Sequence, residues 1–157
     1  MQILLQHGAS VDIADSSGRT PLLWAAARDS RMASWLLLCH NASINATDNT
    51  GRSPLMYASA QGDDYLVRLY LDYSADINQR DNIRGWTSLF WAAENGHGTT
   101  VKLLLEHGAD RNVVDAQSRT LRDVARESGK WRQLKLVLQT YGENGSEENN
   151  SEEDGND

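Results

Sequence analysis

The sequence predicts an all-α repeat solenoid, made of helix-turn-helix repeats and followed by a disordered acidic C-terminal tail. The first observation behind this prediction is a recurring motif: Asp15-Ser-Ser-Gly-Arg-Thr-Pro-Leu22 returns 33 residues later as Asp48-Asn-Thr-Gly-Arg-Ser-Pro-Leu55. A third copy begins at Asp81, again after 33 residues but with one residue inserted, and a weaker fourth copy begins at Asp115. A fixed period of this length is typical of stacked repeats that bury their apolar faces against each other.

The second observation is that the charge is divided sharply along the chain. The net charge is −7. Residues 142–157 hold seven acids and no bases, so the remaining fifteen acids balance the fifteen Lys and Arg of residues 1–141. The last sixteen residues are almost purely Gly, Glu, Asn, Ser and Asp, a composition that buries too little apolar surface to offset the entropy of ordering. We therefore expect a neutral repeat domain over 1–141 and a disordered acidic tail over 142–157.

The motif divides the repeat domain into five parts. Residues 1–14 match only the second half of a repeat and are expected to form a partial one. Three fuller repeats follow at 15–47, 48–80 and 81–114, and a capping repeat is expected at 115–141.

Each full repeat carries the signals of two helices. In the first repeat Thr20 is placed to cap a helix, and Pro21 stands in its first turn, where a missing N–H group costs nothing. Asn41 follows the second helix, where a residue in the left-handed conformation is needed. In the capping repeat Arg122 stands where an inward leucine is expected, so we predict that its side chain points outward while Leu121 or Val124 takes over the packing.

A period of 33 with a Thr-Pro-Leu core resembles the ankyrin repeat, and the resemblance covers roughly residues 1–141. It implies ankyrin-like repeats with hairpin fingertips, and a concave groove, lined by fingertips and inner helices, that binds protein partners. The residue after each turn glycine is then a fingertip position. These residues and their basic or polar neighbours form the expected partner-binding set: Arg19, Arg28, Asn49, Arg52, Arg80, Asn82, Arg84, Trp86 and Arg119.

The groove is therefore expected to be basic, with Trp86 as its one aromatic. Arginine recognises carboxylates through two parallel hydrogen bonds, which favours an acidic protein or peptide as the partner. The alternative is that Gly-Arg is simply frequent at this turn and that the arginines are only solvated. A second series, Trp24, Tyr57 and Trp91, recurs at equivalent helix positions, and packing between repeats is favoured over a binding role for it.

Other classes of function find little support in the sequence. Motifs for hydrolases, phosphate loops, zinc proteases and dinucleotide binding are missing, so we expect neither an enzyme nor a cofactor. The four histidines do not have metal-ligand spacing, and Cys39 is the lone cysteine. A neutral body with an acidic tail disfavours nucleic acid. The chain has neither an apolar run of membrane-spanning length nor a leader-like start, which predicts no membrane association and a cytoplasmic location, with the nucleus left open.

The sequence thus predicts a non-catalytic protein–protein interaction scaffold. The alternative function is a fragment, or a regulatory or spacer arm, of a larger multidomain protein whose activity lies elsewhere. The tail has two interpretations as well. It either only solubilises the chain or folds back as a weak internal lid over the basic segment from Arg119 to Lys135.

Overall fold

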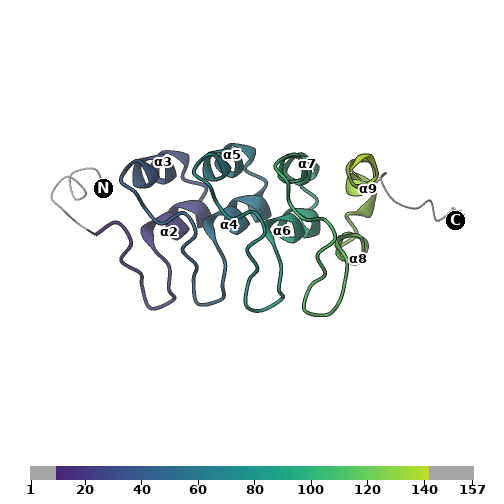
Figure 1. Cartoon of the computed structure of the whole chain (residues 1–157), viewed down its shortest axis with the longest axis horizontal. Helices are drawn as coiled ribbons and strands as arrows, with labels where there is room; N and C mark the ends of the chain where they lie inside the picture. Colours follow the sequence, from purple (N-terminus) through teal and green to yellow (C-terminus); the bar gives the residue numbers. More distant parts are fainter. Residues whose placement is uncertain (1–9, 142–157) are drawn as a thin grey trace, which may run out of the picture.

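The computed structural model describes residues 10–141, which contain eight α-helices and no strand. The helices form two rows joined by hairpin loops that all point to the same side (Figure 1). The inner row consists of α2 (Pro21–Ala27), α4 (Pro54–Gln61), α6 (Ser88–Glu94) and α8 (Leu121–Glu127). The outer row consists of α3 (Arg31–Cys39), α5 (Asp64–Asp72), α7 (Gly98–Glu106) and α9 (Trp131–Thr140). The predicted all-α repeat solenoid is confirmed, whereas the acidic tail and most of the partial repeat lie outside the described residues.

The inner helices start where the Thr-Pro and Ser-Pro pairs predict. The Thr20 hydroxyl accepts a hydrogen bond from the Leu23 amide at 3.4 Å, and Ser53 caps α4 in the same way at 3.4 Å. These bonds satisfy amide groups that have no partner inside the helix. Helix α8 starts with a reciprocal capping box between Thr120 and Asp123.

The outer helices end at residues with positive φ. Gly108 has φ +86°, and the equivalent positions of the two preceding repeats are filled by Asn41 at +60° and Ser74 at +62°. Glycine adopts this conformation without cost, whereas serine has a β-carbon that crowds the backbone. The left-handed residue predicted at Asn41 is therefore confirmed, and Ser74 holds the same shape less comfortably.

The core is a continuous strip between neighbouring repeats. Leu22, Leu55, Leu89 and Leu121 occupy the same position of the inner helices, and all four are buried. Val124 is buried beside Leu121, while Arg122 is exposed and its guanidinium lies 5.4 Å from the centre of the Trp131 ring. The predicted outward direction of Arg122 is therefore confirmed.

Backbone hydrogen bonds join neighbouring hairpin tips into one edge. The Asn49 amide donates to the Ser17 carbonyl at 3.0 Å, and the Asn82 amide donates to the Thr50 carbonyl at 2.9 Å. The tips approach so closely that a β-carbon added to Gly18 would lie 2.5 Å from the Asn49 side chain. The hairpins therefore present the fingertip side chains at fixed places along one side of the solenoid.

Candidate partner-binding groove

The aspartate that opens each repeat organises its own hairpin. Asp48 Oδ1 accepts hydrogen bonds from the Thr50 amide at 2.9 Å, the Thr50 hydroxyl at 2.6 Å and the Arg52 amide at 3.1 Å. Equivalent bonds are made by Asp15, Asp81 and Asp115. The carboxylate thus replaces the missing backbone partners of a tight turn.

The second oxygen of each aspartate accepts a bond from an aromatic side chain. Asp15, Asp48 and Asp81 are bonded by the ring donors of Trp24, Tyr57 and Trp91 at 2.8, 2.6 and 3.1 Å. Tyr57 and Trp91 are buried, which confirms the packing role expected for them, while Trp24 at the end of the row is 36% exposed. The aromatic row therefore fixes the hairpins against the inner helices.

These hydrogen bonds favour the charged form of the aspartates. Burial by itself would raise the pKa of Asp115, but hydrogen bonds from Trp86 and Arg119 outweigh it and lower that pKa to about 2. Burial likewise opposes, and bonds from Thr50 and Tyr57 overcome, the lowering of the pKa of Asp48. Negative charge is thus built into the floor beneath the fingertip arginines.

The fingertip arginines stack between the aromatic rings. The Arg19 guanidinium carbon lies 4.9 Å from the ring centre of Trp24 and 5.6 Å from that of Tyr57. Arg52 lies 5.8 Å from Tyr57 and 3.8 Å from Trp91. Stacking of this kind contributes roughly 0.5–1 kcal/mol at exposed sites and holds the planar guanidinium in one orientation.

The series continues at both ends. Arg28 lies 4.9 Å from the Trp24 ring, and Arg84 lies 5.7 Å from Trp91 and 4.4 Å from Trp86. We call the whole set the arginine–aromatic ladder: Arg28, Trp24, Arg19, Tyr57, Arg52, Trp91, Arg84, Trp86 and Arg119.

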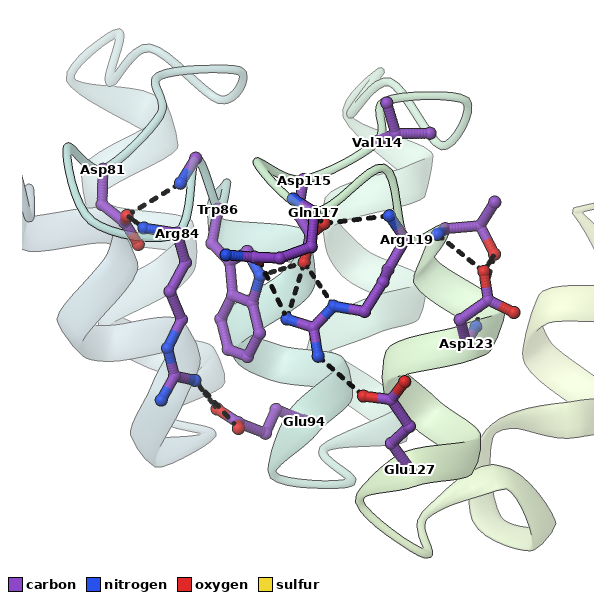
Figure 2. Close-up of polar contacts among 12 residues, drawn as sticks. Asp81, Arg84, Trp86, Glu94, Val114, Asp115, Gln117, Arg119, Asp123 and Glu127 are labelled. Carbon is purple, nitrogen blue, oxygen red and sulfur yellow. Dashed lines mark hydrogen bonds and ion pairs between the residues drawn. The ribbon is translucent and has the colours of Figure 1, made fainter.

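The expectation that Trp86 is the exposed aromatic of the groove is wrong. Its side chain is 1% exposed, and its indole nitrogen donates to Asp115 Oδ2 of the next repeat at 3.0 Å (Figure 2). The inserted residue explains the change: the Asp81 amide bonds to the Trp86 carbonyl, one residue further along than in the Asp48 hairpin, where the partner is Arg52. Arg84 supplies the guanidinium of this hairpin instead.

The arginines differ in whether their charge already has a partner. Arg84 pairs with Glu94 at 3.1 Å, and Arg119 pairs with Asp115 at 2.7 Å and Glu127 at 2.6 Å (Figure 2). Within residues 10–141, the side chains of Arg28 and Arg52 make no ion pair and no hydrogen bond. Arg19 is 3.9 Å from Asp48 Oδ2, too far for a hydrogen bond, and its buried Nε has no acceptor in the part of the chain described.

Two hollows lie along the ladder. One of about 350 Å³ is lined by Arg19, Arg52 and Arg84 together with Tyr57 and Trp91. The next, of about 480 Å³, is lined by the Arg84–Glu94 and Arg119–Glu127 pairs around Trp86. The first hollow is bordered mainly by cations, and the second by ion pairs.

The remaining expected residues have mixed positions. Asn49 and Asn82 are exposed on the fingertips, and the Asn49 amide group also donates to the Ser16 carbonyl at 3.1 Å. Arg80 is exposed, but its guanidinium donates to the carbonyls of Gly85 and Val114 and so ties two hairpins together. Its role in the structure is to join these hairpins.

A patch on the outer helices was not predicted from the sequence. Met32 is 74% exposed, Trp35 46% and Tyr65 49%, and these three side chains with Arg31 line one shallow hollow between α3 and α5. The signal was present, because the second and fifth residues of α7 are Thr99 and Lys102, whereas α3 has Met32 and Trp35 there. Packing of the solenoid therefore does not require apolar side chains at these positions.

Two other classes of site have no basis in the described residues. Residues 10–141 hold no group of three or more His, Cys, Asp or Glu side chains placed to bind a metal. None of the helices between α2 and α9 is both long and apolar enough to cross a lipid bilayer.

Comparison with known proteins agrees with this geometry. A family model described as ankyrin repeats in three copies matches residues 35–115 and 55–145, and a model of the single ankyrin repeat matches residues 17–49. The protein named NAD-capped RNA hydrolase NUDT12 is 49% identical over 41 residues in Homo sapiens, Pongo abelii and Macaca fascicularis. The match covers 26% of this chain and 9% of those relatives, so the chain spans only a small part of their length.

Proposed function

The chain belongs to the ankyrin repeat family, and on this premise we propose that it is a non-catalytic scaffold that binds another protein through the groove along its arginine–aromatic ladder. The single observation that carries the proposal is that Arg28, Arg19 and Arg52 line up on one side of the solenoid without a hydrogen-bonded carboxylate among residues 10–141. An acidic protein or peptide would supply the missing anions.

Ankyrin repeats bind proteins in general, so the finer statement concerns the surface. The ladder is supported over other surfaces by its fixed geometry, because side chains already held by stacking lose less entropy on binding. Function is thereby assigned to a set of side chains and not to the fold alone.

A second candidate is that these repeats are an arm of a larger protein whose activity lies elsewhere. The observation in its favour is that the similar segment amounts to 9% of NUDT12, where the rest of that protein is unrelated to this chain. Both candidates use the same groove, and the second differs only in what is attached to it.

Affinity capture from cell extract tests the groove. The wild type is compared with a double variant, Arg19→Ala with Arg52→Ala, and with Arg68→Ala, which removes an exposed arginine from outer helix α5. We expect proteins that are retained by wild type and by Arg68→Ala, lost from the double variant, and released by raised salt. A set of captured proteins that is the same for all three chains would contradict binding through this groove.

A further inference from the structure

The ladder is divided into two halves by ion pairs within the chain. Towards the C-terminus, Glu94 and Glu127 come from the ends of α6 and α8 and reach Arg84 and Arg119 (Figure 2). Towards the N-terminus, inner helix α2 ends with Ala27 and α4 with Gln61, so neither offers a carboxylate at the matching position. Gln61 instead donates to the carbonyls of Ala26 and Ala27.

The free guanidinium groups are evenly spaced. Arg28 and Arg19 both lie 4.9 Å from the Trp24 ring centre, so their guanidinium carbons are at most about 10 Å apart. Arg19 and Arg52 lie 5.6 and 5.8 Å from the Tyr57 ring centre, which limits their separation to about 11 Å. An extended chain of polyproline II type advances about 9 Å over three residues and returns each third side chain to the same face.

Resting on the proposed function, we propose that the partner segment is an extended acidic peptide with a carboxylate at every third residue. Three such carboxylates bind Arg28, Arg19 and Arg52, and Glu94 sets the limit of the site because it already occupies Arg84. The hollow of about 350 Å³ lined by Arg19, Arg52 and Trp91 receives the last of the three.

The chemistry of the ladder fits a planar carboxylate. Each ring covers one face of a guanidinium, which leaves the N–H edge to form paired hydrogen bonds. The aspartates beneath do not satisfy that edge, because Asp48 Oδ1 already holds the Thr50 and Arg52 amides and Oδ2 holds the Tyr57 hydroxyl. The partner's carboxylates therefore find donors that the protein itself leaves unused.

The role assigned to Glu94 and Glu127 predicts a gain of binding when they are neutralised. The variant Glu94→Gln with Glu127→Gln releases Arg84 and removes one of the two carboxylates that pair with Arg119. A peptide long enough to carry four carboxylates should then bind several-fold more tightly than it binds the wild type. A peptide with three should change less, because its carboxylates already have Arg28, Arg19 and Arg52.

The test uses fluorescein-labelled synthetic peptides and fluorescence anisotropy at low salt. Two probes of twelve residues have the same composition of Gly, Ser, Pro and three Glu, with the Glu at every third position in one and adjacent in the other. A fifteen-residue probe carries four Glu at every third position. The proteins are wild type, Arg52→Ala, Glu94→Gln with Glu127→Gln, and two controls on outer helix α5, Arg68→Ala and Asp72→Asn.

We expect the spaced probe to bind wild type at least threefold more tightly than the adjacent probe, and Arg52→Ala to lose about tenfold while Arg68→Ala loses little. The double glutamine variant should gain on the four-Glu probe by more than Asp72→Asn does. Equal binding of the spaced and adjacent probes would overturn the proposal, as would an equal gain for the double variant and Asp72→Asn.

Failure of this inference is distinguishable from failure of the proposed function. If captured proteins are lost from the Arg19 and Arg52 double variant but the probes do not discriminate spacing, the groove binds proteins by another chemistry and only the inference is wrong. If neither captured proteins nor probes respond to Arg19 or Arg52, the proposed function itself is wrong.

Discussion

The indole nitrogen of Trp86 donates a hydrogen bond of 3.0 Å to Oδ2 of Asp115, the residue that opens the following repeat. In the earlier repeats the aromatic donor comes from the same repeat as the aspartate, as in Tyr57 and Asp48. The capping repeat has Val124 at that position, which has no donor. Trp86 therefore replaces the missing donor and couples the third repeat to the cap.

Replacing Trp86 with Phe should destabilise the protein by about 1–3 kcal/mol, because the buried carboxylate of Asp115 loses a donor while most of the packing remains. Urea unfolding monitored by circular dichroism measures the change. Trp35→Phe is the matched control, since that indole is 46% exposed on outer helix α3. Equal effects of the two substitutions would show that the Trp86 bond does not couple the repeats.

Asp115 should make stability depend on pH in the acid range. Its pKa in the folded protein is lowered to about 2 from 3.8, so its contribution is present above about pH 4 and is lost as the pH falls towards 2. Asp115→Asn removes that contribution, and we expect it to cost about 1–3 kcal/mol at pH 6. The difference from wild type should shrink steadily between pH 4 and pH 2.

The measurement is the free energy of unfolding in urea at several pH values for wild type, Asp115→Asn and the surface control Asp72→Asn. A difference between wild type and Asp115→Asn that stays constant down to pH 2 would contradict the titration of this carboxylate.

Ser74→Gly should stabilise the protein by about 0.5–1 kcal/mol, because serine there has φ +62° and glycine adopts positive φ without crowding. The reverse change is Gly108→Ser at the equivalent position, with φ +86°, where an added β-carbon would meet no atom within 4 Å. It should destabilise by a similar amount through the backbone alone. Thermal and urea unfolding measure both, and shifts of the same sign in the two variants would contradict this explanation.

Removing residues 142–157 tests the proposed lid. The cut chain, ending at Tyr141, loses seven acids. If the tail competes with an acidic partner, truncation should strengthen binding of the spaced acidic probe at low salt and have little effect at high salt, since screening weakens such competition. Affinity unaltered at both salt concentrations would leave the tail a solubilising role only.

Much of the fold could be predicted because its signals are local. Thr20 and Pro21 start a helix through contacts within one turn, and Asn41 ends another through its own backbone preference. Repetition then extends these local rules along the chain. Arg122 could also be predicted, since a charged side chain between buried Leu121 and Val124 has to reach water.

Trp86 shows where prediction from spacing fails. Counting from the turn glycine places it on the fingertip, but the inserted residue lengthens the hairpin and carries its side chain inward. Motif spacing gives the order of residues and not the direction of a side chain in an altered turn. The outer patch of Met32, Trp35 and Tyr65 was missed for a related reason: apolar residues within helices were assumed to be buried.

The sequence by itself determined the period, the helix starts and ends, and the position of basic residues on the hairpins, because each depends on residues within a few positions of one another. Only the tertiary structure decided which arginines are available to a partner. Glu94 meets Arg84 across ten residues, and Glu127 meets Arg119 across eight, where helix and hairpin fold back together. Arg52 stacks on Trp91 of the next repeat and finds no carboxylate within the described chain, because its surroundings are created by the stacking of repeats.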